Sequence, residues 1–165
     1  MTKSEKFQLV ENYIVENQNA HYRLAYSYVK NKESALDIIQ ESIMKALKSI
    51  DTLEQIQYLK TWFYRILINT SIDFINKSKR MVVVEDEVLD FHLPSNEMEI
   101  PDIDLYEAID HLAPKQKTLI ILRFFEDMKI EDIAITLDVN SNTIKTRLYA
   151  ALRKLRSTME EKVKA

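Results

Sequence analysis

The chain has 165 residues, 46% of them hydrophobic and 30% charged, with a net charge of −3, which suits one globular domain or two small ones. It contains no glycine, which disfavours glycine-rich nucleotide-binding loops and β-rich folds and predicts an all-α protein. It also contains no cysteine, which excludes disulfides, thiol nucleophiles and thiolate zinc sites.

The sequence gives no sign of a metal site, a catalytic site or a membrane segment. The histidines, His21, His92 and His111, lie far apart without ligand spacing, so we expect no metal and no cofactor. Nothing assembles a nucleophile, a base and an oxyanion site, so no catalytic residue is expected. Residues 1–6 lack the apolar run of a signal peptide, and no stretch approaches the ~20 apolar residues of a membrane span. We expect a cytoplasmic protein without direct membrane insertion.

The first predicted helix, over 34–50, is strongly amphipathic. At about 100° per residue, one arc is apolar and contains Ala35, Leu36, Ile39, Ile43, Ala46, Leu47 and Ile50. The opposite side is polar except for one methionine and contains Ser34, Asp37, Gln40, Glu41, Met44 and Lys48. Met44 is either a harmless exposed apolar residue or part of a surface that binds a partner.

The second predicted helix, over 58–76, carries two distinct faces. Its core face contains Leu59, Phe63, Ile66, Leu67, Thr70 and Phe74. Beside it lies a stripe of aromatic, guanidinium and amide groups, made of Tyr58, Trp62, Arg65, Asn69 and Asn76. Aromatic rings stack on unpaired bases, arginine neutralises phosphate and asparagine hydrogen-bonds base edges, so the stripe suits single-stranded nucleic acid. The alternative is that Trp62 is half-buried core and that Arg65 and Asn69 are ordinary surface.

An acidic segment separates two blocks of the chain. Residues 1–80 carry a net charge of +3, residues 81–110 carry −10 with no basic residue, and residues 111–165 carry +4. The segment 81–103 contains Pro94 and Pro101 and has no helical period, which is typical of a flexible linker. A short edge strand over 81–84 is the alternative. We therefore expect two small helical domains, 1–80 and 104–165.

The last block predicts a helix-turn-helix. A helix capped by Asp102 runs to 112, and a second begins at Pro114 and runs to 125. A short helix over 130–137, a turn over 138–140 and a final helix from the cap Ser141 to 159 follow. Inward positions of that helix are Ile144, Leu148, Ala151, Leu152 and Leu155; outward ones are Asn142, Thr143, Thr146, Arg147, Tyr149, Arg153 and Lys154. Residues 141–156 hold five cations and no acid, which favours a recognition helix in a DNA major groove.

Taken together, these segments resemble the extracytoplasmic-function (ECF) sigma factors of bacterial RNA polymerase. Residues 62–69, followed by Asp73, resemble the family's promoter-melting segment, and residues 35–49 its polymerase-binding helix. The resemblance to its helix-turn-helix rests on residues 112–114, 122–123, 126, 131, 133–134, 137 and 143–148. The likeness covers residues 10–80 and 104–157 in the family's order.

The resemblance implies a factor that binds the polymerase core, opens the minus-ten promoter element, reads the minus-thirty-five element and is held inactive by an anti-sigma factor. The implied polymerase-binding residues are Asp37, Gln40, Glu41 and Met44. The implied minus-ten contacts are Tyr58, Lys60, Trp62, Arg65 and Asn69. The implied minus-thirty-five contacts are Ser141, Asn142, Thr143, Lys145, Thr146, Arg147, Tyr149 and Arg153. The acidic linker is either a mimic of nucleic acid in the polymerase's RNA path or a solvated tether.

This chain departs from the family at its turns. Asp127, Asp138 and Asn142 stand where the family commonly has glycine, and Asp and Asn tolerate left-handed backbone best after glycine, so we expect these turns to persist with some strain. Lys129 stands near a usual serine cap and has no acceptor. A stand-alone helix-turn-helix regulator is the alternative function, although it explains only residues 111–157. A helical adaptor without nucleic-acid contact is a third class.

Overall fold

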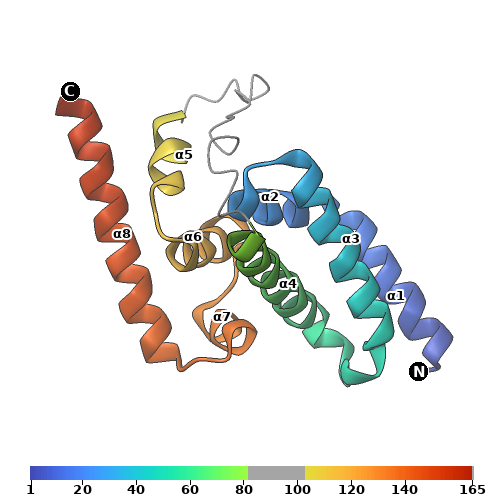
Figure 1. The fold of residues 1–165 in the computed structure, drawn as a ribbon. Coiled ribbons are helices and arrows are strands. Elements are labelled where there is room, and N and C mark those ends of the chain that lie inside the picture. The colour runs from blue at the N-terminus through green and yellow to red at the C-terminus, as the bar shows by residue number, and fades with distance from the viewer. Residues whose placement is uncertain (82–102, 165) are drawn as a thin grey trace. The chain divides into compact units, whose positions relative to one another are not determined.

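The computed structural model describes residues 1–81 and 103–164, which contain helices and no strand (Figure 1). The all-α prediction is therefore confirmed for these residues. The chain divides into two units, Met1–His92 and Leu93–Ala165. Residues 82–102 of the predicted linker, with Asp102 as a cap and the alternative strand beyond Met81, lie outside the described residues.

The described part of unit 1 contains four α-helices. These are α1 (Lys3–Glu16), α2 (Gln18–Val29), α3 (Lys32–Lys48) and α4 (Leu59–Met81) (Figure 1). Two 3-10 turns, η1 (Ile50–Thr52) and η2 (Ile56–Tyr58), connect α3 to α4. The helices α2, α3 and α4 pack against one another. The predicted elements include nothing over 1–33, where α1 and α2 lie.

Capping side chains set where the first helices begin. Thr2 accepts a hydrogen bond from the Glu5 backbone, and the Glu5 carboxylate accepts one from the Thr2 backbone, so α1 starts with a capping box. Asn31 accepts from the Ser34 backbone at 2.9 Å and starts α3. Directly before it, Lys30 ends α2 with a left-handed φ of 56°.

The buried face of α3 differs from the predicted one. Leu36 and Leu47, expected in the apolar arc, are 45% and 36% exposed. The residues that α3 buries are Ala35, Ile38, Ser42 and Ala46. Because α3 packs against both α2 and α4, small side chains at the contact allow the close approach, and the Ser42 hydroxyl is satisfied by the Ile38 carbonyl at 2.7 Å. The predicted arc includes Ala35 and Ala46 but not Ile38 or Ser42, so it is rotated relative to the buried face.

The predicted core face of α4 is confirmed at its central positions, but the prediction is wrong at the edges of this face. Leu59, Phe63, Leu67 and Thr70 are buried as predicted, whereas Ile66 and Phe74 are only half-buried. The additional buried residues are Thr61, Tyr64, Ile68 and Ser71. Two helices, α2 and α3, cover α4, so its buried face is wider than a single-sided stripe. The helix begins one residue after Tyr58, which belongs to η2, and continues beyond 76.

In unit 2, α8 is the element against which α5, α6 and α7 all pack. The described elements are α5 (Ile103–Asp110), α6 (Pro114–Ile120), the π-helical turn η4 (Ile121–Phe125), α7 (Ile130–Leu137) and α8 (Ser141–Lys164) (Figure 1). The inward positions Ile144, Leu148, Ala151 and Leu155 are buried, whereas Leu152 is half-buried. The helix-turn-helix prediction agrees with α7, the turn and α8.

Three details of unit 2 differ from expectation. The helix predicted over 114–125 changes at Ile121 into a π turn, closed by the Glu126 backbone N–H donating to the Ile121 carbonyl at 2.9 Å. Ser141 is the first residue of α8 and not its cap; the Asn140 side chain accepts from the Asn142 backbone at 2.7 Å. The helix α8 continues past 159, where Arg156 pairs with Glu160 at 3.2 Å.

The strained turns follow the expectation at two of three positions. Asp127 and Asp138 have left-handed φ values of 54° and 57°. Asn142 lies inside the first turn of α8 and not in the turn before it. Lys129 precedes α7 without a side-chain cap, as its lack of an acceptor implies. The strained Lys30 was not expected, since lysine carries no turn signal.

Candidate nucleic-acid interface

The outer face of α3 combines carboxylate, amide and apolar side chains. Asp37, Gln40 and Glu41 are exposed, and Met44 is 57% exposed. The helix positions Leu36, Gln40 and Met44 follow one another at four-residue spacing, so the exposed Leu36 lies in line with the predicted set. Leu36 and Leu47 are therefore members of this face that the sequence analysis missed, because their hydrophobicity placed them in the core. An apolar row bordered by acids suits a protein partner.

One acid of that face is already engaged within unit 1. Glu41 Oε2 lies 3.1 Å from Lys45 Nζ, and the same ammonium donates to Thr70 Oγ1 on α4 at 3.3 Å. Lys45 thus joins the outer face of α3 to the buried side of α4. The Glu41–Lys45 pair is half-exposed, so it stabilises the fold only slightly.

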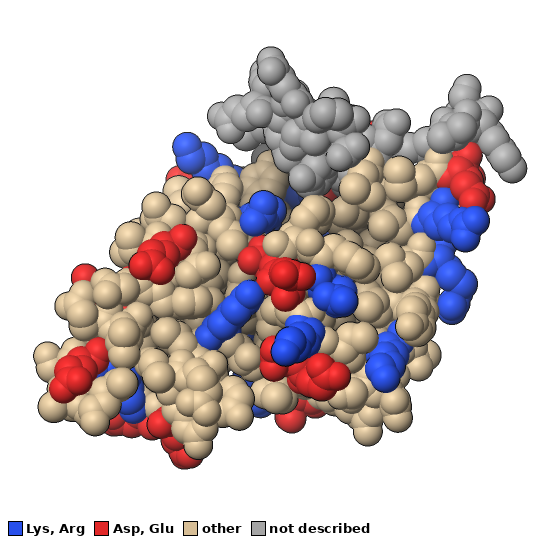
Figure 2. Space-filling model, turned by 180° about the vertical axis from the view of Figure 1, so that it is seen from behind, with Lys and Arg blue, Asp and Glu red and all other residues tan. Residues whose placement is uncertain are grey.

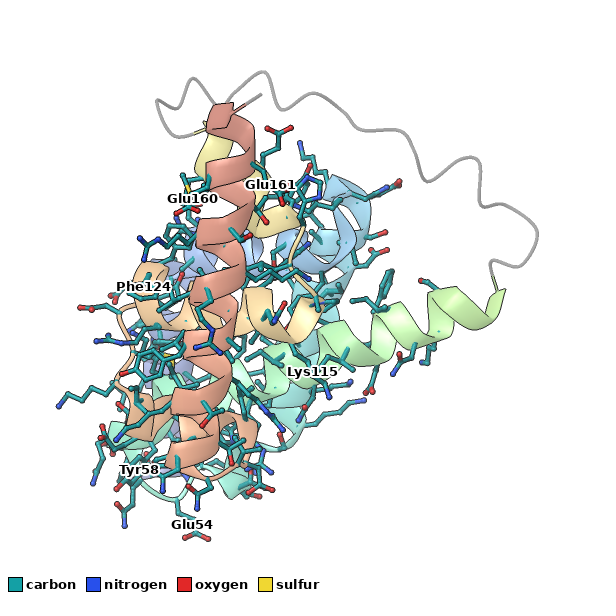
Figure 3. The ribbon with its side chains drawn as sticks, turned by 90° about the vertical axis from the view of Figure 1, so that its left-hand side faces the viewer. Glu54, Tyr58, Lys115, Phe124, Glu160 and Glu161 are labelled. Carbon is teal, nitrogen blue, oxygen red and sulfur yellow. The ribbon has the colours of Figure 1, made fainter. Side chains whose placement is uncertain are left out.

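Four of the five residues predicted to contact the minus-ten element lie in the stripe on η2 and α4. Tyr58, Trp62, Arg65 and Asn69 follow each other at spacings of three and four residues, so they share one side of the η2–α4 rod. Tyr58, Arg65 and Asn69 are exposed, and Trp62 is half-buried. Figure 3 shows Tyr58 at the margin of unit 1, near Glu54 of the α3–α4 connection. Lys60 is exposed but stands two positions from Trp62 and so faces another direction.

Trp62 is held on two sides. Its ring packs against the buried cluster of Val10, Ile50, Leu53 and Leu59. Its indole N–H donates to Thr52 Oγ1 at 2.9 Å. The half-buried Trp62 and the exposed Arg65 and Asn69 fit both the predicted stripe and its alternative.

His21, on α2, is a core residue. It is 1% exposed, its Nε2 lies 3.2 Å from Tyr13 Oη, and its ring centroid is 4.6 Å from that of Phe63 and 5.2 Å from that of Tyr64. Burial, helped by the positive charge of Lys60, lowers its pKa from 6.5 to about 4. His21 is therefore neutral at pH 7, and within 1–81 and 103–164 no group of His, Asp and Glu is arranged to hold a metal ion.

The start of α8 presents the predicted recognition residues. Asn142, Lys145, Thr146, Arg147, Tyr149 and Arg153 are exposed, whereas Ser141 and Thr143 are half-buried. Asn142, Thr146, Tyr149 and Arg153 follow each other at spacings of four, three and four residues and form one line along the helix. Arg147 lies off that line, nearer the edge of the buried face.

Acidic residues enter α8 only near its end, where Glu160 and Glu161 follow the cationic stretch 141–156. Lys and Arg side chains lie along the edge of the molecule where α8 runs in the view from behind, and acidic ones appear at its upper end (Figure 2). Glu160 and Glu161 lie near the C-terminal end of α8, far from its start (Figure 3). The first half of the helix therefore offers an all-cationic surface to a polyanion.

Comparison with protein families assigns both units. Residues 13–81 match the family described as "Sigma-70 region 2", and residues 102–155 match "Sigma-70, region 4". The chain is 50% identical over 143 residues to RNA polymerase sigma factor SigV of Bacillus subtilis (strain 168), covering 87% of this chain and 86% of that protein. It is 27% identical over 155 residues to ECF RNA polymerase sigma factor SigW of the same strain, covering 85% and 83%.

Solved structures show the same fold. The sigma factor RpoE, in complex with the anti-sigma factor NepR from Bartonella quintana, matches with a TM-score of 0.74 at 25% identity, over 91% of this chain and 96% of that one. CnrH, in complex with the cytosolic domain of CnrY, matches with a TM-score of 0.69 at 15% identity, over 94% and 95%. Among the helices described in this chain, none combines the length and apolar character needed to cross a bilayer.

Proposed function

The chain belongs to the sigma-70 family of RNA polymerase sigma factors, in its ECF group, and from this we propose how its surfaces divide the work of initiation. Residues 1–80 bind the polymerase core and open the minus-ten element, and residues 104–165 bind the minus-thirty-five element as duplex. Residues 81–103 connect the two. Sigma factors are DNA-binding initiation factors, so the polymerase and not this chain performs the chemistry, in the cytoplasm.

The polymerase-binding surface in this proposal is the outer face of α3. Asp37, Gln40 and Glu41 provide polar contacts, and Met44 provides an apolar one. The exposure of Leu36 beside them supports the proposal, because a mixed apolar and acidic surface buries area while choosing a basic partner.

In this proposal the stripe on α4 opens the promoter. An unpaired base stacked on an aromatic side chain contributes about 1–3 kcal/mol, comparable with the roughly 0.6–2.2 kcal/mol of stacking lost per base-pair step. Tyr58 and the exposed part of Trp62 supply the aromatic surface, Arg65 the charge and Asn69 the base-edge hydrogen bonds. Lys60, which faces another direction, is assigned a phosphate contact.

Recognition of the minus-thirty-five element falls to the first half of α8. The line Asn142, Thr146, Tyr149 and Arg153 faces the groove, together with Ser141, Thr143 and Lys145, and Arg147 reaches a flanking phosphate. The cationic surface without an acid over 141–156 carries this part of the proposal.

The observation that carries the whole function is the presence of both family regions in one chain, in order, each with its exposed binding surface. A stand-alone helix-turn-helix regulator leaves region 2 unexplained, although that region covers residues 13–81. An adaptor without DNA contact leaves the recognition helix unexplained.

Genomic run-off transcription tests the function. Fragmented genomic DNA of the source bacterium is transcribed by its polymerase core with and without this protein, and transcript 5′ ends are mapped. We expect a small set of new start sites that share upstream sequence at two fixed spacings. No protein-dependent start site would contradict the proposal, and the stand-alone regulator predicts that outcome.

We also propose that an anti-sigma protein holds this factor inactive by covering α3 and the stripe on α4. The relative RpoE was solved with an anti-sigma factor, and the apolar row on α3 is available to an amphipathic helix. The protein is purified from its native cell at its natural abundance, and each co-eluting chain is added to the run-off reaction. Recovery with polymerase subunits alone, before and after stress, would count against this regulation.

A further inference from the structure

The segment between α3 and α4, residues 49–58, contacts the proposed promoter stripe directly. Trp62 Nε1–H donates to Thr52 Oγ1 at 2.9 Å, and Thr52 Oγ1 donates to the Ser49 carbonyl at 2.6 Å. An indole nitrogen only donates, and a hydroxyl has one proton, so the direction of both hydrogen bonds is fixed. Thr52 therefore cannot turn its hydroxyl without losing one of them.

Thr52 itself sits in a segment that α1 holds. Lys6 Nζ donates to the Leu53 carbonyl at 2.7 Å, and the Leu53 side chain is buried with Val10 of α1. On the other side of Thr52, Asp51 lies 3.9 Å from Lys3, an exposed pair of minor energy. Both neighbours of Thr52 therefore contact α1. Most of α1 precedes the match to region 2, which begins at residue 13.

The result is an indole with a fixed orientation. Packing on Leu59 and its neighbours limits the ring on one side, and the bond to Thr52 limits its rotation in its own plane. An aromatic side chain ordered before binding loses less entropy when a base stacks on it.

From this arrangement we propose that Thr52 is a positioning residue, which holds the Trp62 indole ready for an unpaired promoter base. The proposal rests on the proposed role of the α4 stripe in promoter opening. Thr52 needs no DNA contact of its own, and its effect passes through Trp62.

The test removes the hydroxyl and keeps the shape. Thr52→Val deletes both hydrogen bonds, Thr52→Ser retains the hydroxyl, and Thr158→Val makes the same change in α8, where Thr158 only donates to the Lys154 carbonyl. Trp62 is the one tryptophan of the chain, so intrinsic fluorescence reports its environment alone. The holoenzyme is then scored for permanganate reactivity on a promoter taken from the run-off experiment.

We expect Thr52→Val to increase acrylamide quenching of Trp62 and to lower the opened fraction by roughly threefold to tenfold, the cost of immobilising one side chain at the interface. Thr52→Ser keeps the wild-type quenching and the wild-type opened fraction, and Thr158→Val changes neither. In a Trp62→Phe background, which lacks the indole N–H, Thr52→Val has no further effect on opening.

Unchanged opening in Thr52→Val overturns the proposal, as does a loss that persists in Thr52→Ser or that adds to Trp62→Phe. If Thr52→Val does not fold, Thr52→Ala removes the same hydroxyl, and its effect on opening is compared in the wild-type and Trp62→Phe backgrounds. Asn69→Ala runs in parallel: a loss of opening there with none in Thr52→Val rejects this proposal and leaves the proposed function standing. Unchanged opening in Asn69→Ala and Arg65→Ala rejects the proposed role of the α4 stripe in promoter opening.

Discussion

The stability of unit 1 should depend on pH through His21. Its pKa is about 4 in the folded chain against 6.5 when exposed, so the unfolded chain binds the proton more readily. The stability that neutral His21 contributes is therefore fully present above pH 6.5 and is lost as pH falls toward 4. A difference of this size corresponds to about 3 kcal/mol, a large share of the stability of a small domain.

Urea unfolding measures this loss, with Trp62 fluorescence as a signal confined to unit 1. Carboxylates titrate in the same range, so the comparison is between wild type and His21→Gln, which cannot take up the proton. We expect His21→Gln to be less stable at pH 7 and to approach wild type as pH falls toward 4. Parallel pH profiles for wild type and His21→Gln would show that protonation of His21 does not destabilise unit 1.

Three further predictions follow from the surfaces and turns. Reversing Asp37 and Glu41 to Lys should weaken core binding on the order of tenfold with unchanged circular dichroism, because like charges then face a basic partner; equal affinity would contradict the assignment of α3. Arg147→Ala should weaken all duplexes alike and lower the salt slope by about one, whereas Arg153→Ala should cost ~1–3 kcal/mol at one base pair; no loss on any duplex would remove α8 from the groove. Asp138→Gly should raise the free energy of unfolding by about 0.5–1 kcal/mol, and with it the thermal midpoint, because the left-handed residue that ends α7 then has no Cβ; a lower midpoint would show that the Asp138 side chain matters more than strain.

The elements that sequence predicts well are those in which large apolar residues decide the buried face. The final helix is such a case, since Ile144, Leu148, Ala151 and Leu155 all point inward as expected. The same holds for Phe63 and Leu67 on α4. Once the buried positions are known, the remaining positions of each helix are expected to be exposed. The sequence therefore predicts the stripe on α4 and the cationic start of α8.

Elements escaped prediction where packing depends on small or polar residues. The helix α2 buries the polar His21 and Ser27 together with Leu24 and Ala25, which weakens the apolar pattern of its inner face. The buried face of α3 includes Ile38 and Ser42, which lie outside the predicted arc, and leaves Leu36 exposed. The π turn at the end of α6 has no sequence signal of its own.

Within the candidate site, the bond between Thr52 and Trp62 joins residues ten positions apart through a turn, so it became visible only in three dimensions. Sequence spacing had grouped Trp62 with its helix neighbours alone. The aromatic box around His21 is similar, because it draws on α1, α2 and α4 together.

In our proposal α4 captures the opened minus-ten strand, and permanganate footprinting of the holoenzyme measures this capture. Asn69→Ala and Arg65→Ala are compared with wild type on one promoter, with duplex binding measured on a minus-thirty-five fragment. We expect thymines of the opened region to lose reactivity in both variants while binding of the fragment is unchanged. Full reactivity in both variants would contradict it and would make the stripe an ordinary surface of unit 1.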